Sequence, residues 1–111
     1  MKHIIAFIKH HKLNKVTYEL RKIEGLTGMT VMEVKGFGRG KKENIPIEEQ
    51  LEDFVPHVKI EIFCRDELVE TIVQTIEINA HTGLRGDGKI YICRAEQAIR
   101  ISTGERGEAA I

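Results

Sequence analysis

The sequence predicts an α+β fold of the ferredoxin-like type, in which an antiparallel sheet carries two helices on one face. The chain divides into two similar halves, and each half has the order strand, helix, strand. Right-handed crossovers within such halves bring the four strands into one βαββαβ sandwich. The length of 111 residues, with 41% apolar and 31% charged residues, fits one small soluble domain over residues 1–111.

The first half begins with an apolar, β-branched strand at residues 3–9. Residues 12–23 then place apolar side chains at helical spacing and predict an amphipathic helix. Its stripe consists of Leu13, Val16, Leu20 and Ile23. The alternating segment 29–37 predicts the second strand. Residues 37–56 are rich in glycine and then in charge, which predicts a long protruding loop.

The second half repeats this order. Residues 57–64 alternate as a third strand, and residues 66–78 form a second helical pattern. Its stripe consists of Leu68, Val69, Ile72, Val73 and Ile76. Residues 81–88 read as a loop and residues 89–95 as the fourth strand, which leaves a C-terminal segment at residues 95–111.

Two helices on one face leave the other face of the predicted sheet to be covered. The first and third strands read as apolar on both sides, which predicts self-association. Cys64 and Cys93 lie in the third and fourth strands without a motif spacing. Two reduced core thiols are therefore favoured over a disulfide or a metal pair.

Charge and hydropathy exclude several classes of protein. Seventeen acidic residues balance seventeen basic ones, whereas a nucleic-acid or lipid-surface binder needs a basic excess. No apolar run reaches membrane-spanning length, and the apolar stretch near the N-terminus is too short for the core of a signal peptide. We therefore expect a cytoplasmic protein that binds no nucleic acid and does not insert directly into a membrane.

Residues 83–89 read G-x-x-x-x-G-K, the first seven positions of a phosphate-binding P-loop. The match is weak, because Ile90 replaces the expected Ser or Thr and Lys89 enters a strand rather than a helix. Glycines at 86 and 88 still allow backbone N–H groups to approach phosphate oxygens, and Lys89 adds a positive charge. The alternative is that this stretch is only a tight turn.

A second glycine-rich stretch, GFGRGK, follows the second strand. Arg39 within it offers a planar guanidinium suited to phosphate. Because the two stretches end equivalent strands of the two halves, we expect one anion site between them. The alternative, a flexible hinge without a ligand, is equally compatible with the composition.

The stretches GMTVMEVKGFGRG, TGLRGDGKIYI and RISTGERGEAAI resemble the PII signal-transduction (nitrogen regulatory protein P-II) family. The resemblance covers nearly the whole chain and omits only the middle of the long loop. It implies a ferredoxin-like homotrimer that binds ATP or ADP in clefts between subunits. Such a protein is a regulator rather than an enzyme, and it controls a transporter, enzyme or kinase through the loop after the second strand.

The resemblance also implies which residues bind the nucleotide. The phosphate contacts would be Gly36, Gly38, Arg39, Gly86, Asp87, Gly88 and Lys89. Arg100 would reach the phosphates from a neighbouring subunit. The adenine and ribose contacts would be Gly28, Met29 and Thr30, and the base pocket would be lined by Phe7, Glu61 and Phe63.

Several positions depart from the family pattern. Residues 36–57 contain no Tyr, Ser or Thr, so the loop, which is also shorter than usual, offers no hydroxyl for covalent modification. Gly40 replaces an expected Gln and His57 an expected Lys, which predicts weak or absent binding of 2-oxoglutarate and leaves a magnesium ion uncertain. Ser102 replaces a second Arg, so ADP or AMP is expected to compete well with ATP.

Other functions stay open at this point. The five histidines form no dedicated metal pattern, yet a PII-like regulator of metal efflux or of another non-nitrogen transport system remains an alternative. A weak ATPase and a scaffold without a ligand are two more. The sequence does not name the partner protein, for which a membrane transporter is one candidate.

Overall fold

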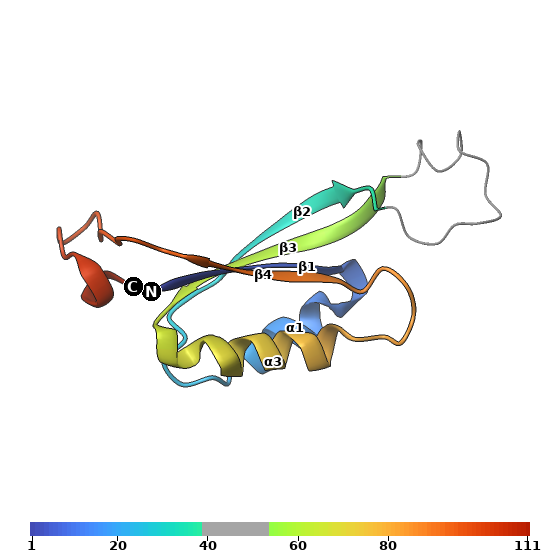
Figure 1. Cartoon of the computed structure of the whole chain (residues 1–111), viewed down its shortest axis with the longest axis horizontal. Helices are drawn as coiled ribbons and strands as arrows, with labels where there is room; N and C mark the ends of the chain where they lie inside the picture. The colour runs from blue at the N-terminus through green and yellow to red at the C-terminus, as the bar shows by residue number, and fades with distance from the viewer. Residues whose placement is uncertain (39–53) are drawn as a thin grey trace.

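The computed structural model describes residues 1–38 and 54–111. The elements in chain order are β1 (Lys2–Lys9), η1 (His10–Lys12), α1 (Leu13–Leu20), β2 (Thr30–Gly36), β3 (Val55–Cys64), η2 (Asp66–Leu68), α3 (Val69–Ala80), β4 (Gly88–Arg94) and η3 (Gly107–Ala110). The sheet has the strand order β2-β3-β1-β4, and all neighbouring strands are antiparallel. Helices α1 and α3 cover one face of it (Figure 1). The predicted ferredoxin-like sandwich is confirmed.

One hydrophobic core fills the space between the sheet and the helices. Alternate residues of β1 and β3 point into it, because side chains alternate between the two faces of a strand. The strands contribute Ile4, Ala6, Ile8, Val58, Ile60, Ile62 and Cys64, and the helices contribute Val16, Leu20, Ile72, Ile76 and Ala80. The other members of the two predicted stripes pack around this core: Leu13, Ile23, Leu68, Val69 and Val73. Burial of each large aliphatic side chain stabilises the fold by about 1.5–3 kcal/mol.

The open face of the sheet is more polar than the sequence predicted. On β1, Ile5 and Phe7 point to this face. On β3, His57, Lys59 and Glu61 point there, so the prediction that the third strand is apolar on both sides is wrong. The aliphatic residues between these positions face the helices: Val58, Ile60 and Ile62. Self-association through this face stays a prediction.

β3 begins at Val55, two residues earlier than predicted. The register with β1 ends at His57, whereas Val55 and Pro56 continue to pair with β2. Proline is tolerated near the start of a strand, where the ladder of hydrogen bonds is incomplete. The result is a β2–β3 hairpin that projects past the ends of β1 and β4 (Figure 1). The rest of the predicted loop, including Arg39 and Gly40, lies outside the described residues.

Helices α1 and α3 are each preceded by a 3-10 turn. The helix predicted at residues 12–23 is α-helical from Leu13 to Leu20, and the one predicted at residues 66–78 runs from Val69 to Ala80. No helix in residues 1–38 and 54–111 is long and apolar enough to cross a membrane.

The two cysteines are free but differ in environment. Cys64 is buried on β3, and burial raises the pKa of its thiol. Cys93 is exposed on β4, which is an edge strand. The prediction of two core thiols is therefore correct for Cys64 and wrong for Cys93.

Candidate functional site

A cleft of about 720 Å³ opens where the β2–β3 hairpin projects from the sheet. Its floor is the open face, on which Phe7 pairs with Lys89 and Val34 pairs with His57. The turn before β4 forms one wall and the base of the hairpin forms another. Seven predicted nucleotide-binding residues line the cleft: Phe7, Gly36, Gly38, Gly86, Asp87, Gly88 and Lys89.

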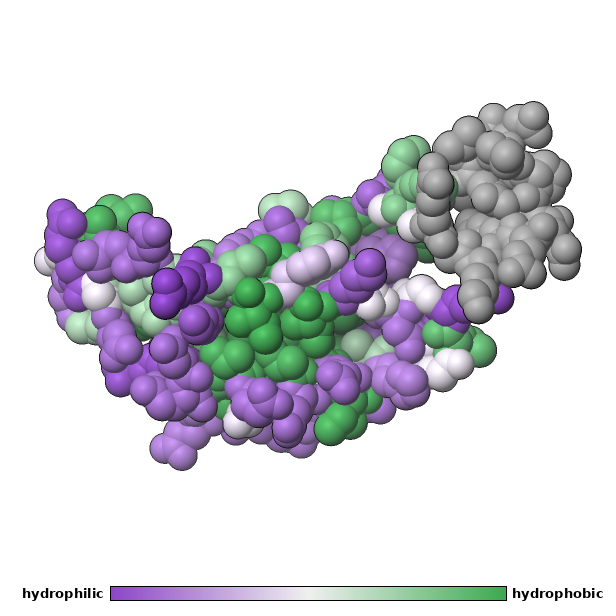
Figure 2. Space-filling model, viewed as in Figure 1, coloured by the Kyte–Doolittle hydropathy of each residue, from purple (hydrophilic) through white to green (hydrophobic). Residues whose placement is uncertain are grey.

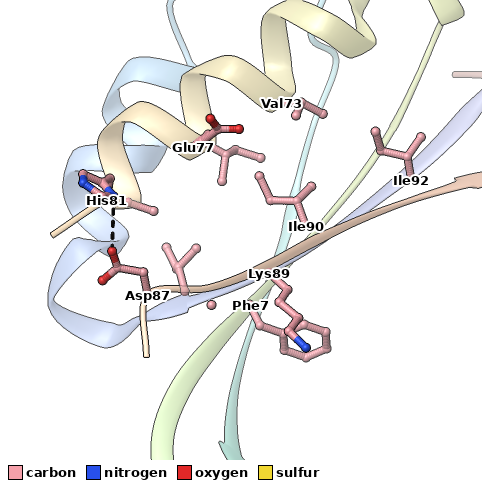
Figure 3. Close-up of a pocket in the computed structure, with 12 residues that line it drawn as sticks. Phe7, Val73, Glu77, His81, Asp87, Lys89, Ile90 and Ile92 are labelled. Atoms are coloured by element: carbon pink, nitrogen blue, oxygen red, sulfur yellow. Dashed lines mark ion pairs between the residues drawn. The ribbon is translucent and has the colours of Figure 1, made fainter. Parts of the chain in front are cut away.

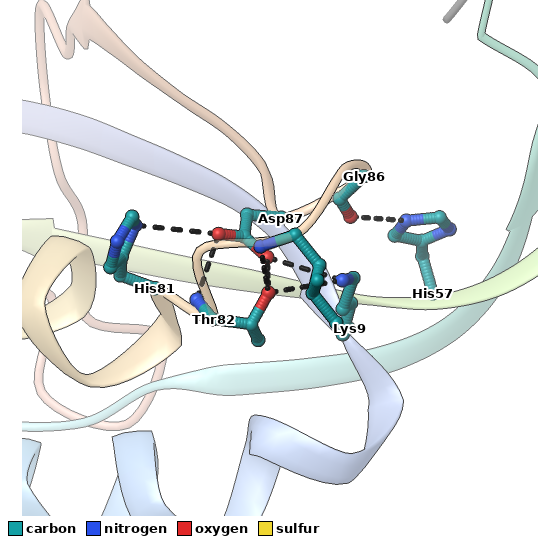
Figure 4. Close-up of polar contacts among 7 residues, drawn as sticks. Lys9, His57, His81, Thr82, Gly86 and Asp87 are labelled. Atoms are coloured by element: carbon teal, nitrogen blue, oxygen red, sulfur yellow. Dashed lines mark hydrogen bonds and ion pairs between the residues drawn. The ribbon is translucent and has the colours of Figure 1, made fainter.

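The turn at residues 81–88 is held together by the Asp87 carboxylate (Figure 4). Thr82 donates to it twice, from its backbone N–H at 2.8 Å and from its hydroxyl. The Lys9 ammonium lies 3.2 Å from Oδ1, and His81 Nδ1 lies 3.4 Å from Oδ2. These contacts, led by the Thr82 hydroxyl, hold the pKa of Asp87 well below its usual value. The negative charge of Asp87 is therefore compensated by donors and cations next to the turn. We expect only the backbone of Asp87 to approach a bound anion.

Two glycines are required by the backbone of this turn. Gly86 has φ +79°, and Gly88 has φ +107°, a region that side chains rarely adopt. A Cβ built on Gly88 would lie 1.6 Å from the carbonyl oxygen of Phe7, so β4 approaches β1 too closely for any side chain here. The glycine spacing therefore has a structural origin as well as the predicted functional one.

The cleft favours anions. Of the described residues that line it, Asp87 is the single carboxylate, and four carry positive side chains: Lys9, Lys35, Arg85 and Lys89. Phe7 and Tyr91 add an aromatic surface, with ring centroids 6.3 Å apart in an edge-to-face arrangement. Cations and glycine backbone beside an aromatic pair suit a ligand that has both a polyanionic and a flat apolar part.

Six other predicted site residues do not line this cleft. They are Gly28, Met29, Thr30, Glu61, Phe63 and Arg100. Thr30 pairs with Glu61 toward the opposite end of the sheet from the hairpin. Glu61 lies four residues along β3 from His57, or about 13 Å, and Phe63 lies about 20 Å away. One chain therefore presents the predicted residues as two separate groups.

Glu61 belongs to a polar cluster on the open face. Lys59 Nζ donates to its carboxylate at 3.0 Å, and His3 Nε2 lies 2.8 Å from it. These two contacts, with Lys59 the larger, lower the pKa of Glu61. The His3 ring stacks on Phe63, with centroids 4.3 Å apart. One face of the Phe63 ring therefore packs on His3, and Phe63 is 49% exposed.

Arg100 lies in the C-terminal segment, beyond the end of β4. Its guanidinium lies 3.6 Å from Glu105 and donates to the Ile111 carbonyl oxygen at 3.4 Å. A single bridge between Ile99 and Arg106 closes the segment on itself. Ile101, next to Arg100, is 99% exposed.

A second, smaller groove of about 390 Å³ runs between α3 and β4 on the helix side of the sheet. Apolar surface gathers there (Figure 2), and its walls are Val73, Ile76, Ile90 and Ile92. His81 and Asp87 pair at one end of the groove, beside Glu77 (Figure 3).

No group of three or more His, Cys, Asp or Glu side chains in residues 1–38 and 54–111 is arranged to hold a metal ion. His10 lies in a 3-10 turn and pairs with Glu33 at 3.3 Å. The alternative of a PII-like regulator of metal efflux is not tested by this finding.

Sequence reasoning missed Lys9, Arg85 and Tyr91 as cleft residues. Lys9 is two residues from Phe7 on β1, and Tyr91 is two residues from Lys89 on β4. Residues two apart on a strand face the same side of the sheet, so this alternation was a usable signal. Arg85 stands beside the glycine turn, where its charge was equally visible in the sequence.

The fold is a small α+β domain of the ferredoxin-like class, whose projecting hairpin and glycine turn enclose a cleft with four positive side chains. The model of the family "Nitrogen regulatory protein P-II" matches residues 1–105. Nitrogen regulatory protein P-II of Klebsiella oxytoca and nitrogen regulatory protein P-II 1 of Escherichia coli strain K12 are each 50% identical to this chain. Each alignment spans 113 positions and covers 100% of both proteins.

A solved structure agrees with these relatives. The crystal structure of Arabidopsis thaliana PII bound to citrate superposes with a TM-score of 0.82 and 37% identity, and the match covers 99% of this chain and 91% of that one. The chain therefore belongs to the nitrogen regulatory protein P-II family, whose members are signal-transduction regulators and not enzymes.

Proposed function

We propose that this chain senses adenine nucleotides and controls a partner protein through its projecting hairpin. The observation that carries the proposal is the cationic cleft, in which the glycine turn at residues 86–88 and Lys89 face the base of the hairpin. The family binds adenine nucleotides as effectors, and the solved Arabidopsis relative holds citrate, itself a polyanion. ATP or ADP would place its phosphates on the turn and its base against the aromatic surface.

We further propose that each nucleotide is held between two copies of a homotrimer. Lys89 and Arg100 are both assigned to the phosphates, yet Lys89 is near the start of β4 and Arg100 lies beyond its end. The five residue steps from Lys89 to Arg94 alone span about 17 Å of strand. A phosphate chain cannot touch both side chains within one molecule, so Arg100 would come from a neighbour. Exposed Ile99 and Ile101 beside it supply apolar surface for such a contact.

Docking of the partner through the hairpin is supported by its apolar base. Phe37 and Val55 line the cleft and are exposed, and Phe54 beside them is 59% exposed. A nucleotide in the cleft would therefore touch the same segment that a partner would use. The cytoplasm, where nucleotides are abundant, is the compartment we propose.

Calorimetry and light scattering test the nucleotide site. We expect a trimer that binds ADP or ATP with micromolar affinity, and Lys89→Ala should weaken binding by about 1.5–3 kcal/mol, the size of a charge-assisted contact. Lys15→Ala, on the exposed side of α1, is the matched control and should bind like the unmodified protein. A monomer, or equal affinity in the two variants, would contradict the assignment.

Mixed trimers test the shared site. Lys89→Ala and Arg100→Ala chains are each expected to bind weakly alone. If the two residues come from different subunits, co-expression of both variants in equal amounts restores about one intact site in four. If both residues act within one chain, no intact site forms and binding stays weak.

A further inference from the structure

The His57 ring contacts both walls of the cleft, and Figure 4 shows its contact with Gly86 in the turn. Its Nδ1 lies 3.1 Å from the carbonyl oxygen of Val55, at the base of the hairpin. Its Nε2 lies 3.3 Å from the carbonyl oxygen of Gly86, in the turn assigned to phosphate. A single half-buried side chain thus connects the proposed ligand site to the element that projects toward a partner.

The chemistry of these two contacts depends on a proton. A carbonyl oxygen only accepts hydrogen bonds, so each ring nitrogen must donate. A neutral imidazole has one N–H and satisfies one of the two carbonyls, whereas an imidazolium has two and satisfies both. The bridge is therefore complete only when His57 is positively charged.

Most of the charged side chains around His57 are cations. The charged groups of the described residues around it are Lys9 on β1, Lys35 on β2, Lys59 on β3, Arg85 and Asp87 in the turn, and Lys89 on β4. Lys9 pairs with Asp87, and Lys59 pairs with Glu61. The cations around His57 that have no carboxylate partner within the described residues are therefore Lys35, Arg85 and Lys89. A phosphate chain on the turn would reverse the local potential and favour the imidazolium.

We propose that His57 is a positioning residue that takes up a proton when a polyanion enters the cleft, and then ties the glycine turn to the base of the hairpin. This inference rests on the proposed nucleotide site and deepens it. Through His57, phosphates bound on the glycine turn would restrain the base of the hairpin. The proton uptake also makes the response of this regulator dependent on pH in the range where imidazole titrates.

Calorimetry of metal-free ADP in buffers of different ionisation enthalpy measures the proton uptake. The matched variant is His57→Gln, whose amide nitrogen can still donate hydrogen bonds but cannot take up a proton in this pH range. Protons taken up by ADP itself are common to both proteins, so their difference reports His57. At pH 7 we expect the unmodified protein to take up about half a proton more than the variant.

The pH profile gives a second readout that a purely structural role would not move. The affinity ratio of unmodified protein to His57→Gln should fall about 3- to 10-fold between pH 6 and pH 8, because the imidazolium form binds more tightly. Nitrogen-15 NMR of the His57 ring should show both nitrogens protonated once ADP is bound. His11→Gln, an exposed residue of η1, is the control and should follow the unmodified protein.

The outcomes separate this inference from the proposed function. If the unmodified protein binds no adenine nucleotide, the proposed function fails, and the inference fails with it. If ADP binds while proton uptake equals that of His57→Gln and the ring stays neutral, the inference is overturned and the nucleotide site stands.

Discussion

Asp87 decides the local shape of the site at the scale of single residues. It lies between Gly86 and Gly88, and its carboxylate is the common acceptor for Thr82, Lys9 and His81. A carboxylate next to bound phosphate costs free energy unless its charge is compensated. Here the compensation is internal, since Lys9 and two Thr82 donors face it.

We predict that Asp87 makes stability depend on pH below about 5. Its folded-state pKa is depressed below the unfolded value, so its contribution is present above the unfolded pKa and is lost as the pH falls below it. Asp87→Asn should therefore be less stable than the unmodified protein at pH 7, and the difference should shrink toward pH 2. Urea unfolding at several pH values measures this. Glu24→Gln is the surface control, and an unchanged gap at pH 2 would contradict the prediction.

A second prediction at this scale is that 2-oxoglutarate binds weakly or not at all. The family resemblance implies an oxoacid site that uses a metal-orienting oxygen and a cation, and this chain has Gly40 and His57 at those positions. Both nitrogens of the His57 ring already face backbone carbonyls, so no donor remains for a carboxylate. Calorimetry of the Mg-ATP complex with 2-oxoglutarate should show no saturation in the micromolar range.

The double variant Gly40→Gln with His57→Lys provides the positive control for that titration. It restores both groups and should gain oxoacid affinity. Micromolar affinity in the unmodified protein would mean that other residues rebuild the oxoacid site.

At the scale of elements, the start of β4 controls how the turn meets the sheet. Gly88 pairs with Ile8 while its backbone adopts a positive φ, and the Phe7 carbonyl occupies the space that a side chain would need. The turn is thereby pressed against β1, which brings Lys89 beside Phe7 on the open face.

Gly88→Ala is predicted to destabilise the fold strongly, because it adds a direct backbone clash to the strain of a positive φ. Gly83→Ala is the matched variant, since Gly83 has φ +80° with open space around its Cβ position. We expect about 1–2 kcal/mol for Gly83→Ala, from strain alone, and clearly more for Gly88→Ala. Urea denaturation compares the two. Equal losses would show that the close approach to Phe7 relaxes without cost.

At the scale of the whole molecule, the proposed function depends on copies that complete one another. The cleft occupies one end of the open face, while Glu61, Phe63 and Arg100 are presented elsewhere. The β2–β3 hairpin projects from the same end of the sheet as the cleft (Figure 1). Ligand binding and partner docking would therefore share the hairpin end of each subunit.

We predict that the loop carries no nucleotidyl or phosphoryl modification in the cell. The loop modifications that the family resemblance implies are made on a Tyr or Ser hydroxyl, and residues 36–57 contain no Tyr, Ser or Thr. Mass spectrometry of the protein from its native cells, grown with abundant and with scarce nitrogen, should find this segment unmodified under both conditions. A nucleotidyl or phosphoryl adduct mapped within residues 36–57 would refute the prediction.

The order of elements and most of the core were predictable from the sequence because their signals are local. Val16 and Leu20 repeat at helical spacing, and Ile4, Ala6 and Ile8 alternate along a strand, so each element reveals its buried side on its own. The start of β3 was missed because Pro56 usually marks a loop. Pairing with β2 alone allows it to lie in a strand.

The sequence by itself determined the fold class, the family resemblance and the glycine-and-lysine turn, since each depends on residues close together along the chain. The tertiary structure decided that Lys9 and Tyr91 join the cleft, that Cys93 is exposed, and that the His57 ring lies between Val55 and Gly86. These facts depend on strand register and strand order. Register is set by pairing between segments far apart in the chain, so no local pattern specifies which side chains will meet across the sheet.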